Sequence, residues 1–257
     1  MRAPLTKISR RKLIFTGLGA AAGLSGLGVA ARLAEKYGLV PPDGRGFYGL
    51  GETLTYASHR LIGRRALARE FSPDEISNPA FANEIAPPLE DAFKRLQAAN
   101  FADWRVTVDG LVDRPGSFSL PQLKSFPSRS QITEIACEEG WSHVAEWHGV
   151  PLSHVLNLVG VQPQARYVVY FSIQHDWKES IDMDDAMHPQ TFLTYGMNGA
   201  DLPVASGGPL RLRVPRQLGY KSVKFLTHIA VTDDLKKFGK DRGSAAVGAG
   251  YAWYAGI

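Results

Sequence analysis

The hydrophobic pattern of the chain becomes regular only after residue 103. In the segment WRVTVDGLVDRPGSFSL, Trp104, Val106 and Val108 alternate with polar neighbours, which predicts a strand, a turn and a second strand. The segment PLRLRVP alternates in the same way, so its apolar residues share one strand face while Arg211 and Arg213 share the other. Further strands are predicted at residues 131–137, 166–173 and 223–231.

Two short helices are predicted between these strands. The first spans SLPQLKSF, with Ser119 as its N-cap and Pro121 in its first turn. The second spans PLSHVLNLVG, with Pro151 at its start and Gly160 just past its end. Many short strands with a few short helices are typical of a mixed α+β domain, which we place at residues 101–235.

The segments on either side of this domain differ from it in composition and lack its regular hydrophobic pattern. Residues 32–100 are expected to form an irregular N-terminal arm with short helices, because prolines interrupt any long element. These prolines are Pro41, Pro42, Pro73, Pro79, Pro87 and Pro88. Residues 236–257 are rich in glycine and aromatic side chains, and we expect them to pack as a C-terminal strap.

The charge distribution excludes one class of partner. The chain has 257 residues, and its net charge of +4 comes from 29 basic and 25 acidic residues. Five of the basic residues lie within residues 1–31, which contain no acidic residue. The remainder therefore carries 24 basic against 25 acidic residues, so we expect no nucleic-acid partner.

The N-terminus has the layout of a bacterial export signal. Arg10 and Arg11 precede an uncharged stretch rich in Gly and Ala, residues 13–31, and together they look like a twin-arginine signal peptide. The segment Gly28-Val29-Ala30 resembles a small-x-small cleavage site, although anchoring of residues 13–31 in the membrane is the alternative. We therefore expect export to the periplasm by the twin-arginine machinery, which carries folded proteins that often hold a cofactor.

The chain contains a single cysteine, Cys137, in the segment TEIACEEGWSH. One cysteine excludes an internal disulfide, an all-cysteine zinc site and an iron–sulfur cluster held by one chain. A buried, small apolar residue is the usual role of a free cysteine. However, Glu138 and Glu139 follow directly, and a core strand does not normally end in two carboxylates.

Three chemical roles remain for Cys137. A nucleophile could use His143, His148 or His154 as its base, but the neighbouring carboxylates raise a thiol pKa, whereas a nucleophile needs it lowered. A zinc site formed with these histidines lacks the usual spacing. The third role is a single thiolate on a transition metal whose other ligands come from an organic cofactor.

A cradle for such a cofactor is predicted within residues 206–224. Gly207 and Gly208 allow close backbone approach, and Arg211 can clamp a phosphate through two hydrogen bonds. The turn at residues 219–224 adds further donors. The segment contains neither a GxGxxG fingerprint nor a GK[ST] loop, so nucleotide binding is not indicated. An exposed basic strand face is the alternative interpretation.

Four stretches together resemble the sulfite-oxidase-type molybdopterin oxidoreductases. They span residues 104–120, 136–156, 184–215 and 219–231, in the order and spacing of that family. The resemblance is strongest to the branch that contains the periplasmic protein-methionine-sulfoxide reductase catalytic subunit. It implies the sulfite-oxidase-like molybdopterin-binding fold, an α+β fold of mixed strands with short helices.

The resemblance also implies a cofactor, Mo-molybdopterin, and a set of residues that hold it. Cys137 corresponds to the thiolate ligand of molybdenum, and two dithiolene sulfurs of one molybdopterin with oxo or hydroxo groups supply the other equatorial ligands. The positions that correspond to cofactor contacts are Asn83, Ser172, Ser206, Arg211, Ser222, Val223 and Lys224. The sulfoxide-reductase branch has threonine at the position of Ser172 and asparagine at that of Ser206.

The activity implied by this family is two-electron oxygen-atom transfer. Glu138 and Glu139 would repel an anionic substrate, and Glu139 matches a glutamate of the sulfoxide-reductase branch, so we assign it with Cys137 to the catalytic site. We therefore expect reduction of an S-oxide or N-oxide, small or protein-bound. The alternatives are a sulfite-oxidase-type dehydrogenase and a cofactor-free binding protein on the same fold.

Two further expectations concern partners. The chain has no CxxCH motif for haem attachment, so electrons are expected from a separate donor such as a membrane haem protein. Only about twenty residues follow the predicted domain, which leaves no room for the dimerisation domain of eukaryotic sulfite oxidases, and a monomer is expected.

Overall fold

The computed structural model describes residues 32–34, 37–43, 49–81 and 87–257. These residues belong to two compact units, Met1–Arg64 and Arg65–Ile257. In the first unit, helix α3 (Gly49–Leu61) is the longest described element. Within the described residues, no helix has the length and apolar character needed to cross a membrane. The expected signal, with residues 13–31, lies outside them.

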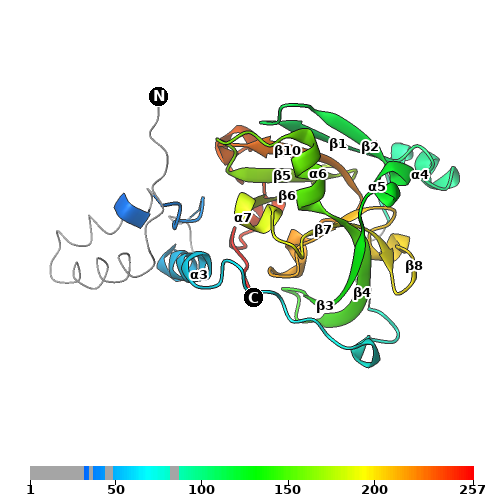
Figure 1. The fold of residues 1–257 in the computed structure, drawn as a ribbon, viewed down its shortest axis with the longest axis horizontal. Coiled ribbons are helices and arrows are strands. Elements are labelled where there is room, and N and C mark those ends of the chain that lie inside the picture. The colour runs from blue at the N-terminus through cyan, green and yellow to red at the C-terminus, as the bar shows by residue number, and fades with distance from the viewer. Residues whose placement is uncertain (1–31, 35–36, 44–48, 82–86) are drawn as a thin grey trace. The chain divides into compact units, whose positions relative to one another are not determined.

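Two β-sheets form the frame of the second unit (Figure 1). The first has the strand order β2-β1-β10-β5-β6, and its β1–β10 pair is parallel while the other pairs are antiparallel. Its strands are β1 (Arg105–Gly110), β2 (Gly116–Ser119), β5 (Tyr167–Ser172), β6 (Lys178–Asp182) and β10 (Leu226–Thr232).

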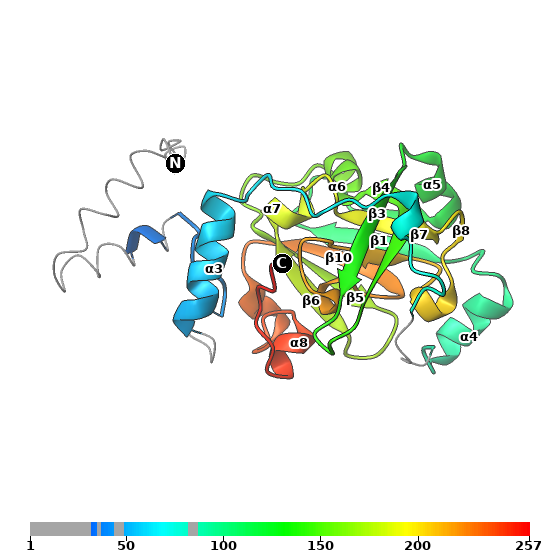
Figure 2. The same cartoon turned by 90° about the horizontal axis from the view of Figure 1, so that it is seen from below.

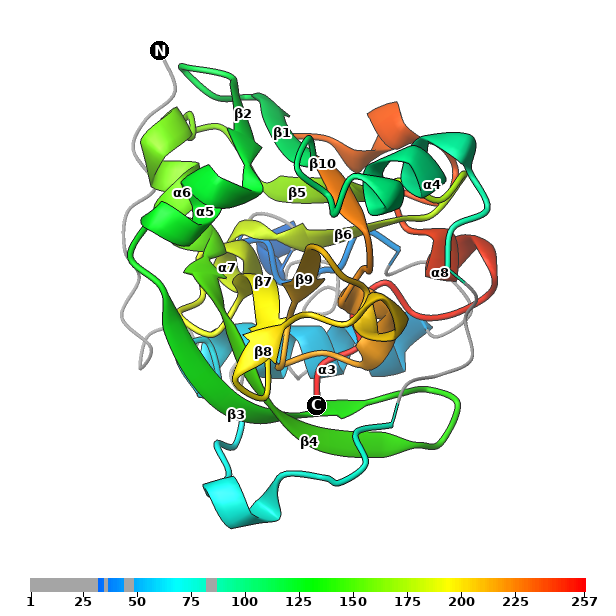
Figure 3. The ribbon, with the colours of Figure 1, turned by 90° about the vertical axis from the view of Figure 1, so that its right-hand side faces the viewer.

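The second sheet has the order β3-β4-β7-β8, with β9 paired to β7. Figure 3 shows β3 and β4 as a long hairpin, with β7 and β9 following beside it. The strands are β3 (Arg129–Ala136), β4 (Ser142–Pro151), β7 (Phe192–Met197), β8 (Ala200–Asp201) and β9 (Arg211–Arg213).

Short helices connect and cover the strands. The α-helices are α4 (Asp91–Ala98), α5 (Leu120–Ser125), α6 (Leu152–Val159), α7 (Met183–Ala186) and α8 (Ala245–Gly248). The 3-10 turns are η1 (Pro73–Glu75), η2 (Val204–Ser206), η3 (Gly219–Lys221) and η4 (Leu235–Phe238). The α+β fold of mixed strands with short helices that the sequence predicts is thereby confirmed.

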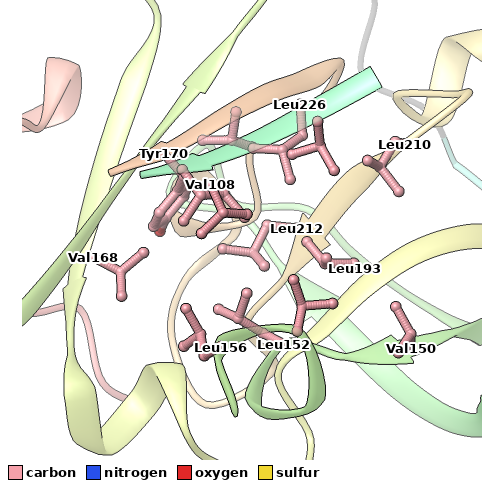
Figure 4. Packing of buried hydrophobic residues seen from close by; sticks show 14 of the residues in the cluster. Val108, Val150, Leu152, Leu156, Val168, Tyr170, Leu193, Leu210, Leu212 and Leu226 are labelled. Atoms are coloured by element: carbon pink, nitrogen blue, oxygen red, sulfur yellow. The ribbon is translucent and has the colours of Figure 1, made fainter. Parts of the chain in front are cut away.

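The main hydrophobic core combines side chains of both sheets (Figure 4). Val108 and Leu226 of the first sheet pack in one cluster with Leu193 and Leu212 of the second, and Leu152 joins them from α6. Burial of this apolar surface supplies the main driving force that holds the two sheets together. The core therefore fixes the relative position of the strand ends that carry the polar site described below.

Most local predictions are confirmed. Trp104, Val106 and Val108 are all buried, as their alternation predicts. The Ser119 hydroxyl accepts a hydrogen bond from the backbone N–H of Gln122 and caps α5. Helix α6 ends at Gly160, which has a φ of 70° in the left-handed region that glycine adopts readily.

One interpretation is wrong. The alternation in PLRLRVP led us to consider an exposed basic strand face as the alternative to a phosphate cradle. In the structure both faces of β9 are buried, and Arg211 and Arg213 are only 4% and 0% exposed. The basic face turns inward because β9 lies inside the molecule rather than at its surface, and alternation alone does not distinguish these two situations.

The C-terminal segment packs against β6 and η3, and Figure 2 shows α8 beside β6. One oxygen of the buried Glu179 carboxylate accepts hydrogen bonds from Lys221 Nζ at 2.9 Å and Ser244 Oγ at 2.6 Å. The other oxygen accepts from the backbone N–H of Ala246 at 2.9 Å. This network joins β6, the C-terminal segment and the η3 turn, which lines the site described next.

Candidate molybdopterin site

A pocket of about 310 Å³ lies in the second unit, where the β3–β4 turn, the loop after β5, η2, β9 and η3 meet. It brings together seven residues of the predicted site: Cys137, Glu139, Ser206, Arg211, Ser222, Val223 and Lys224. The other lining residues are Phe81, Ile135, Glu138, Trp141, His143, Gln174, His175, Trp177, Ala205, Gly219 and Tyr220. Segments up to 143 residues apart in the sequence, from Phe81 to Lys224, thus converge on one cavity.

One described residue of the predicted set, Ser172, is not part of this lining. Ser172, at the end of β5, uses its hydroxyl to accept a hydrogen bond at 3.1 Å from the backbone N–H of Gln174, which does line the pocket. Asn83 lies outside the described residues. Ser172 therefore supports the wall of the pocket rather than its surface.

Cys137 sits in the tight turn between β3 and β4. Its backbone N–H donates to the carbonyl oxygen of Trp141 at 2.8 Å, and its own carbonyl accepts from Gly140 N–H at 3.1 Å. Gly140 has a φ of 90°, a conformation that residues with a side chain rarely adopt. The turn holds the Cys137 side chain, half-buried, at the wall of the pocket.

The environment of the thiol favours a metal ligand over two other roles considered for Cys137, the nucleophile and the packed core residue. Its Sγ lies 3.3 Å from Glu138 Oε2 and 3.6 Å from Glu139 Oε2. Burial, with the two neighbouring carboxylates, raises the Cys137 pKa to about 12. An unmetallated thiol is therefore protonated at neutral pH, which disfavours the nucleophile. Its place on a pocket wall disfavours simple core packing, whereas a bound metal would deprotonate it.

The basic floor of the pocket is formed by buried arginines of β9: Arg211 belongs to the lining, and Arg213 lies outside the lining but bonds the lining residue Ser222. Arg211 donates to the carbonyl oxygens of Ser206 at 2.7 Å and Ser222 at 2.6 Å. Arg213 donates to Ser222 Oγ and to the carbonyl oxygen of Glu134, both at 3.0 Å. Within the described part of the chain, neither guanidinium meets a carboxylate.

This floor calls for a bound anion. Burial lowers the Arg211 pKa to about 9, and burial together with the Arg211 charge lowers the pKa of Arg213 well below its usual value. The nitrogen Nε of each guanidinium is buried without a hydrogen-bond partner among the described residues. Buried charges are normally paired, because removing them from water costs several kcal/mol. A phosphate at the pocket would supply the missing counter-charge.

Lys224 completes the basic floor. Its Nζ donates to the carbonyl oxygen of Ala205 at 2.7 Å, and burial together with the Arg211 charge lowers its pKa to about 7. Gly207 lies against this side chain with a φ of 100°, and a Cβ there would come within 2.6 Å of Lys224 Cγ. Glycine is required here both by the backbone conformation and by the space.

Gly207→Ala is expected to lower the free energy of unfolding by about 1–3 kcal/mol and to displace Lys224. Gly199→Ala is the matched control, since Gly199 has a φ of 78° but a Cβ there would meet no described atom within 4 Å. In the control, the free energy of unfolding should fall only by about 1–2 kcal/mol, which is the cost of placing alanine in a left-handed backbone conformation. Urea unfolding and bound pterin content measure both effects, and equal pterin content in the two variants would contradict the steric role.

Sequence reasoning assigned no cofactor role to several residues in or next to the pocket. Arg213 shares a strand face with Arg211, so the alternation that identified one could have identified the other. His143 follows Trp141 at a spacing of two residues, and the two rings are stacked with centroids 6.0 Å apart. Phe81 and Trp177 carry no local signal, because only the tertiary fold brings them to the pocket.

The donor set fits a metal held mainly by a cofactor. Among the described residues, no three His, Cys, Asp or Glu side chains are close enough to hold a metal ion together. The pocket instead offers one soft thiolate donor, Cys137, beside a floor that requires an anion. One protein thiolate with a phosphate-bearing dithiolene cofactor, molybdopterin, matches that combination.

The family comparison agrees with this chemistry. The family described as the oxidoreductase molybdopterin binding domain matches residues 94–238, which is more than half of the chain. The chain belongs to this family. The resemblance that the four sequence stretches indicated is confirmed, and membership of a molybdopterin-binding family supports Mo-molybdopterin as the cofactor.

Curated relatives carry more specific names. A putative protein-methionine-sulfoxide reductase subunit YedZ1 of Azospira oryzae is 38% identical over 167 residues, covering 65% of this chain and 60% of the relative. The protein-methionine-sulfoxide reductase catalytic subunit MsrP of Xanthomonas axonopodis is 36% identical, covering 59% and 52%. MsrP of Ralstonia nicotianae is 37% identical, covering 51% and 44%. The chain thus spans about half the length of these relatives.

A solved structure supports the fold. The sulfane dehydrogenase SoxCD from Paracoccus pantotrophus aligns with a TM-score of 0.50 at 23% sequence identity. The alignment covers 66% of this chain and 46% of the SoxCD chain. At this identity the likeness concerns the arrangement of strands and helices, and the prediction of a sulfite-oxidase-like fold is confirmed.

Proposed function

We propose that this chain is the catalytic part of a periplasmic molybdenum oxidoreductase that reduces an S-oxide or N-oxide. The observation that carries the proposal is a pocket lined by a half-buried thiol, Cys137, and by a buried guanidinium group, Arg211, that meets no carboxylate among the described residues. When bound, Mo-molybdopterin supplies two-electron oxygen-atom transfer. The S-oxide gains two electrons and two protons and leaves as the sulfide, with its oxygen released as water.

Different residues of the chain would bind the metal and the phosphate of the cofactor. Cys137 would bind molybdenum as a thiolate, and the carboxylates beside it would accept the thiol proton when the metal binds. Arg211 and Lys224 would hold the phosphate, with Ser206, Ser222 and the backbone at Val223 completing the cradle. These assignments rest on the pocket geometry together with the family resemblance.

The substrate side of the pocket favours a neutral compound. Glu138 and Glu139 place two negative charges beside Cys137, and Trp141 donates its indole N–H to Glu139 Oε2 at 2.8 Å. The rings of Phe81 and Trp141 lie 4.7 Å apart in the lining. An uncharged sulfoxide with apolar substituents suits this surface, and the relatives named protein-methionine-sulfoxide reductase support a methionine S-oxide, free or within a protein.

The wider setting of the enzyme is part of the same proposal. Arg10 and Arg11 support export in the folded state by the twin-arginine route, with the cofactor already in place. Electrons come from a separate donor, for which a membrane haem protein is suited, since no CxxCH motif occurs in the sequence.

Metal and pterin analysis tests the proposal. The full chain is exported from a bacterial host that makes molybdopterin, purified without chelators, and analysed for molybdenum and for the fluorescent oxidation product of the pterin. One molybdenum and one pterin per chain are expected. A chain that carries neither would refute the enzyme and favour a cofactor-free binding protein.

Substrate preference is tested with the purified holoenzyme. Reduced viologen dye with methionine sulfoxide or an N-oxide should give faster turnover than sulfite with an oxidising dye. Replacing both carboxylates, Glu138→Gln with Glu139→Gln, should raise sulfite turnover relative to sulfoxide turnover by about threefold or more, because it removes electrostatic repulsion. Efficient sulfite oxidation by the unmodified enzyme, with no sulfoxide reduction, would instead identify a sulfite-oxidase-type dehydrogenase.

A further inference from the structure

His143 is a buried polar residue of the pocket to which the family resemblance assigns no role. It belongs to β4, lines the pocket, and is only 6% exposed. Neither of its ring nitrogens meets a hydrogen-bond partner among the described residues. A buried polar group without a partner is rare in native structures and costs about 1–3 kcal/mol. An occupant of the pocket would remove this cost.

The surroundings of the imidazole fix its orientation. Its ring is nearly parallel to that of Trp141, with centroids 6.0 Å apart and an interplanar angle of 12°. It also contacts Trp147 at 5.9 Å, and the Arg213 guanidinium lies over the Trp147 ring at 4.7 Å. The imidazole is therefore part of an aromatic cluster with Trp141 and Trp147.

The charge state of His143 decides what it can bind. Burial, followed by the charges of Arg213, Arg211 and Lys224, lowers the His143 pKa to about 4. The side chain is thus a neutral imidazole at pH 7, with one N–H donor and one nitrogen acceptor. A phosphate needs donors only, and the neighbouring guanidinium groups already supply them. A donor and an acceptor on one ring are better matched to the N–H, ring-nitrogen and carbonyl groups of a heterocycle.

We propose that His143 is a cofactor-binding residue whose neutral imidazole hydrogen-bonds the heterocyclic ring of the pterin, while Arg211 and Lys224 hold the phosphate. This inference rests on the proposed function, because the pterin is its ligand. It divides the pocket into a cationic part that recognises the anion and an aromatic part that recognises the ring. Loss of His143 should then weaken retention of the cofactor without weakening the fold.

Two variants at His143 and one control test the inference. His143→Phe keeps an aromatic ring against Trp141 and Trp147 but removes the hydrogen bond, whereas His143→Gln keeps a donor and an acceptor. His148→Phe is the control, since His148 lies on the same strand, outside this pocket, and bonds Ser130. Each protein is isolated with its cofactor, and pterin retained after serial dilution and gel filtration is measured over time.

The expected results differ between the variants. His143→Phe should release pterin about tenfold faster than the unmodified chain, the factor that corresponds to one hydrogen bond. His143→Gln should retain most of it, and His148→Phe should match the unmodified chain. The cofactor-free form of His143→Phe should melt at the same temperature as the unmodified chain or higher, because a buried polar group without a partner has been replaced.

Three outcomes would overturn the inference. Unchanged pterin release from His143→Phe would show that the imidazole does not bind the cofactor. A lowered melting temperature of the cofactor-free His143→Phe protein, without recovery in His143→Gln, would show a structural role. Absence of pterin from the unmodified chain would remove the proposed function and this inference with it, whereas the first two outcomes leave the proposed function intact.

Discussion

Cys137→Ser is expected to abolish oxygen-atom transfer, with a loss of roughly a thousandfold or more, because the change removes the only protein thiolate in the pocket. A serine hydroxyl has a much higher pKa than a thiol and is a harder donor, so it is a poor ligand for a soft metal. Molybdenum content and turnover of methionine sulfoxide, measured on the same preparation, report the loss.

The stability of this variant should change little. Cys137 is half-buried in a turn and outside the core, so replacement by the similar serine should alter the free energy of unfolding by about 1 kcal/mol or less. Ser142→Ala, in the same hairpin but outside the pocket lining, is the matched control and should keep full activity and molybdenum. A Cys137→Ser enzyme with normal molybdenum and turnover would contradict the assigned role.

The fold could be read from the sequence where a local pattern determines it. The alternation at Trp104, Val106 and Val108 placed β1, and capping at Ser119 placed α5, because both signals act within a few residues. The pairing of β1 with β10, parallel and more than a hundred residues apart, has no such signal. Long-range pairing depends on the packing of the whole core, which a single sequence does not display.

In the candidate site too, local sequence signals could be interpreted, whereas features that depend on the tertiary fold could not. The single cysteine and the basic alternation of β9 pointed to two segments, and the fold brings those segments to one pocket. The burial of Arg211 and Arg213 could not be predicted, because an alternating strand can turn its polar face either to solvent or to an internal cavity. His143 was considered as a base or a zinc ligand beside Cys137 but not as a cofactor contact, since its exposure and partners depend on strands distant in sequence.

We expect the Arg211 charge to strengthen binding of the cofactor phosphate but to destabilise the cofactor-free protein. Among the described residues, the guanidinium is buried and hydrogen-bonds only neutral carbonyl oxygens, so its charge is costly until an anion arrives. Arg216, five residues along, provides a contrast, because it is also buried but lies 3.4 Å from the Asp185 carboxylate. The two arginines therefore differ in whether the chain itself supplies the counter-charge.

Arg211→Met is accordingly expected to weaken pterin binding by about a hundredfold or more, because charge-assisted bonds to phosphate are lost. The cofactor-free protein should lose little stability, since two carbonyls without donors are offset by removal of a buried charge. Arg216→Met should do the reverse, lowering stability by about 3–5 kcal/mol because the buried Asp185 carboxylate loses this cation, while the pocket lining stays intact. Pterin content of the two variants as isolated, and urea unfolding of their cofactor-free forms, measure the contrast, and normal pterin retention in Arg211→Met would exclude the phosphate role.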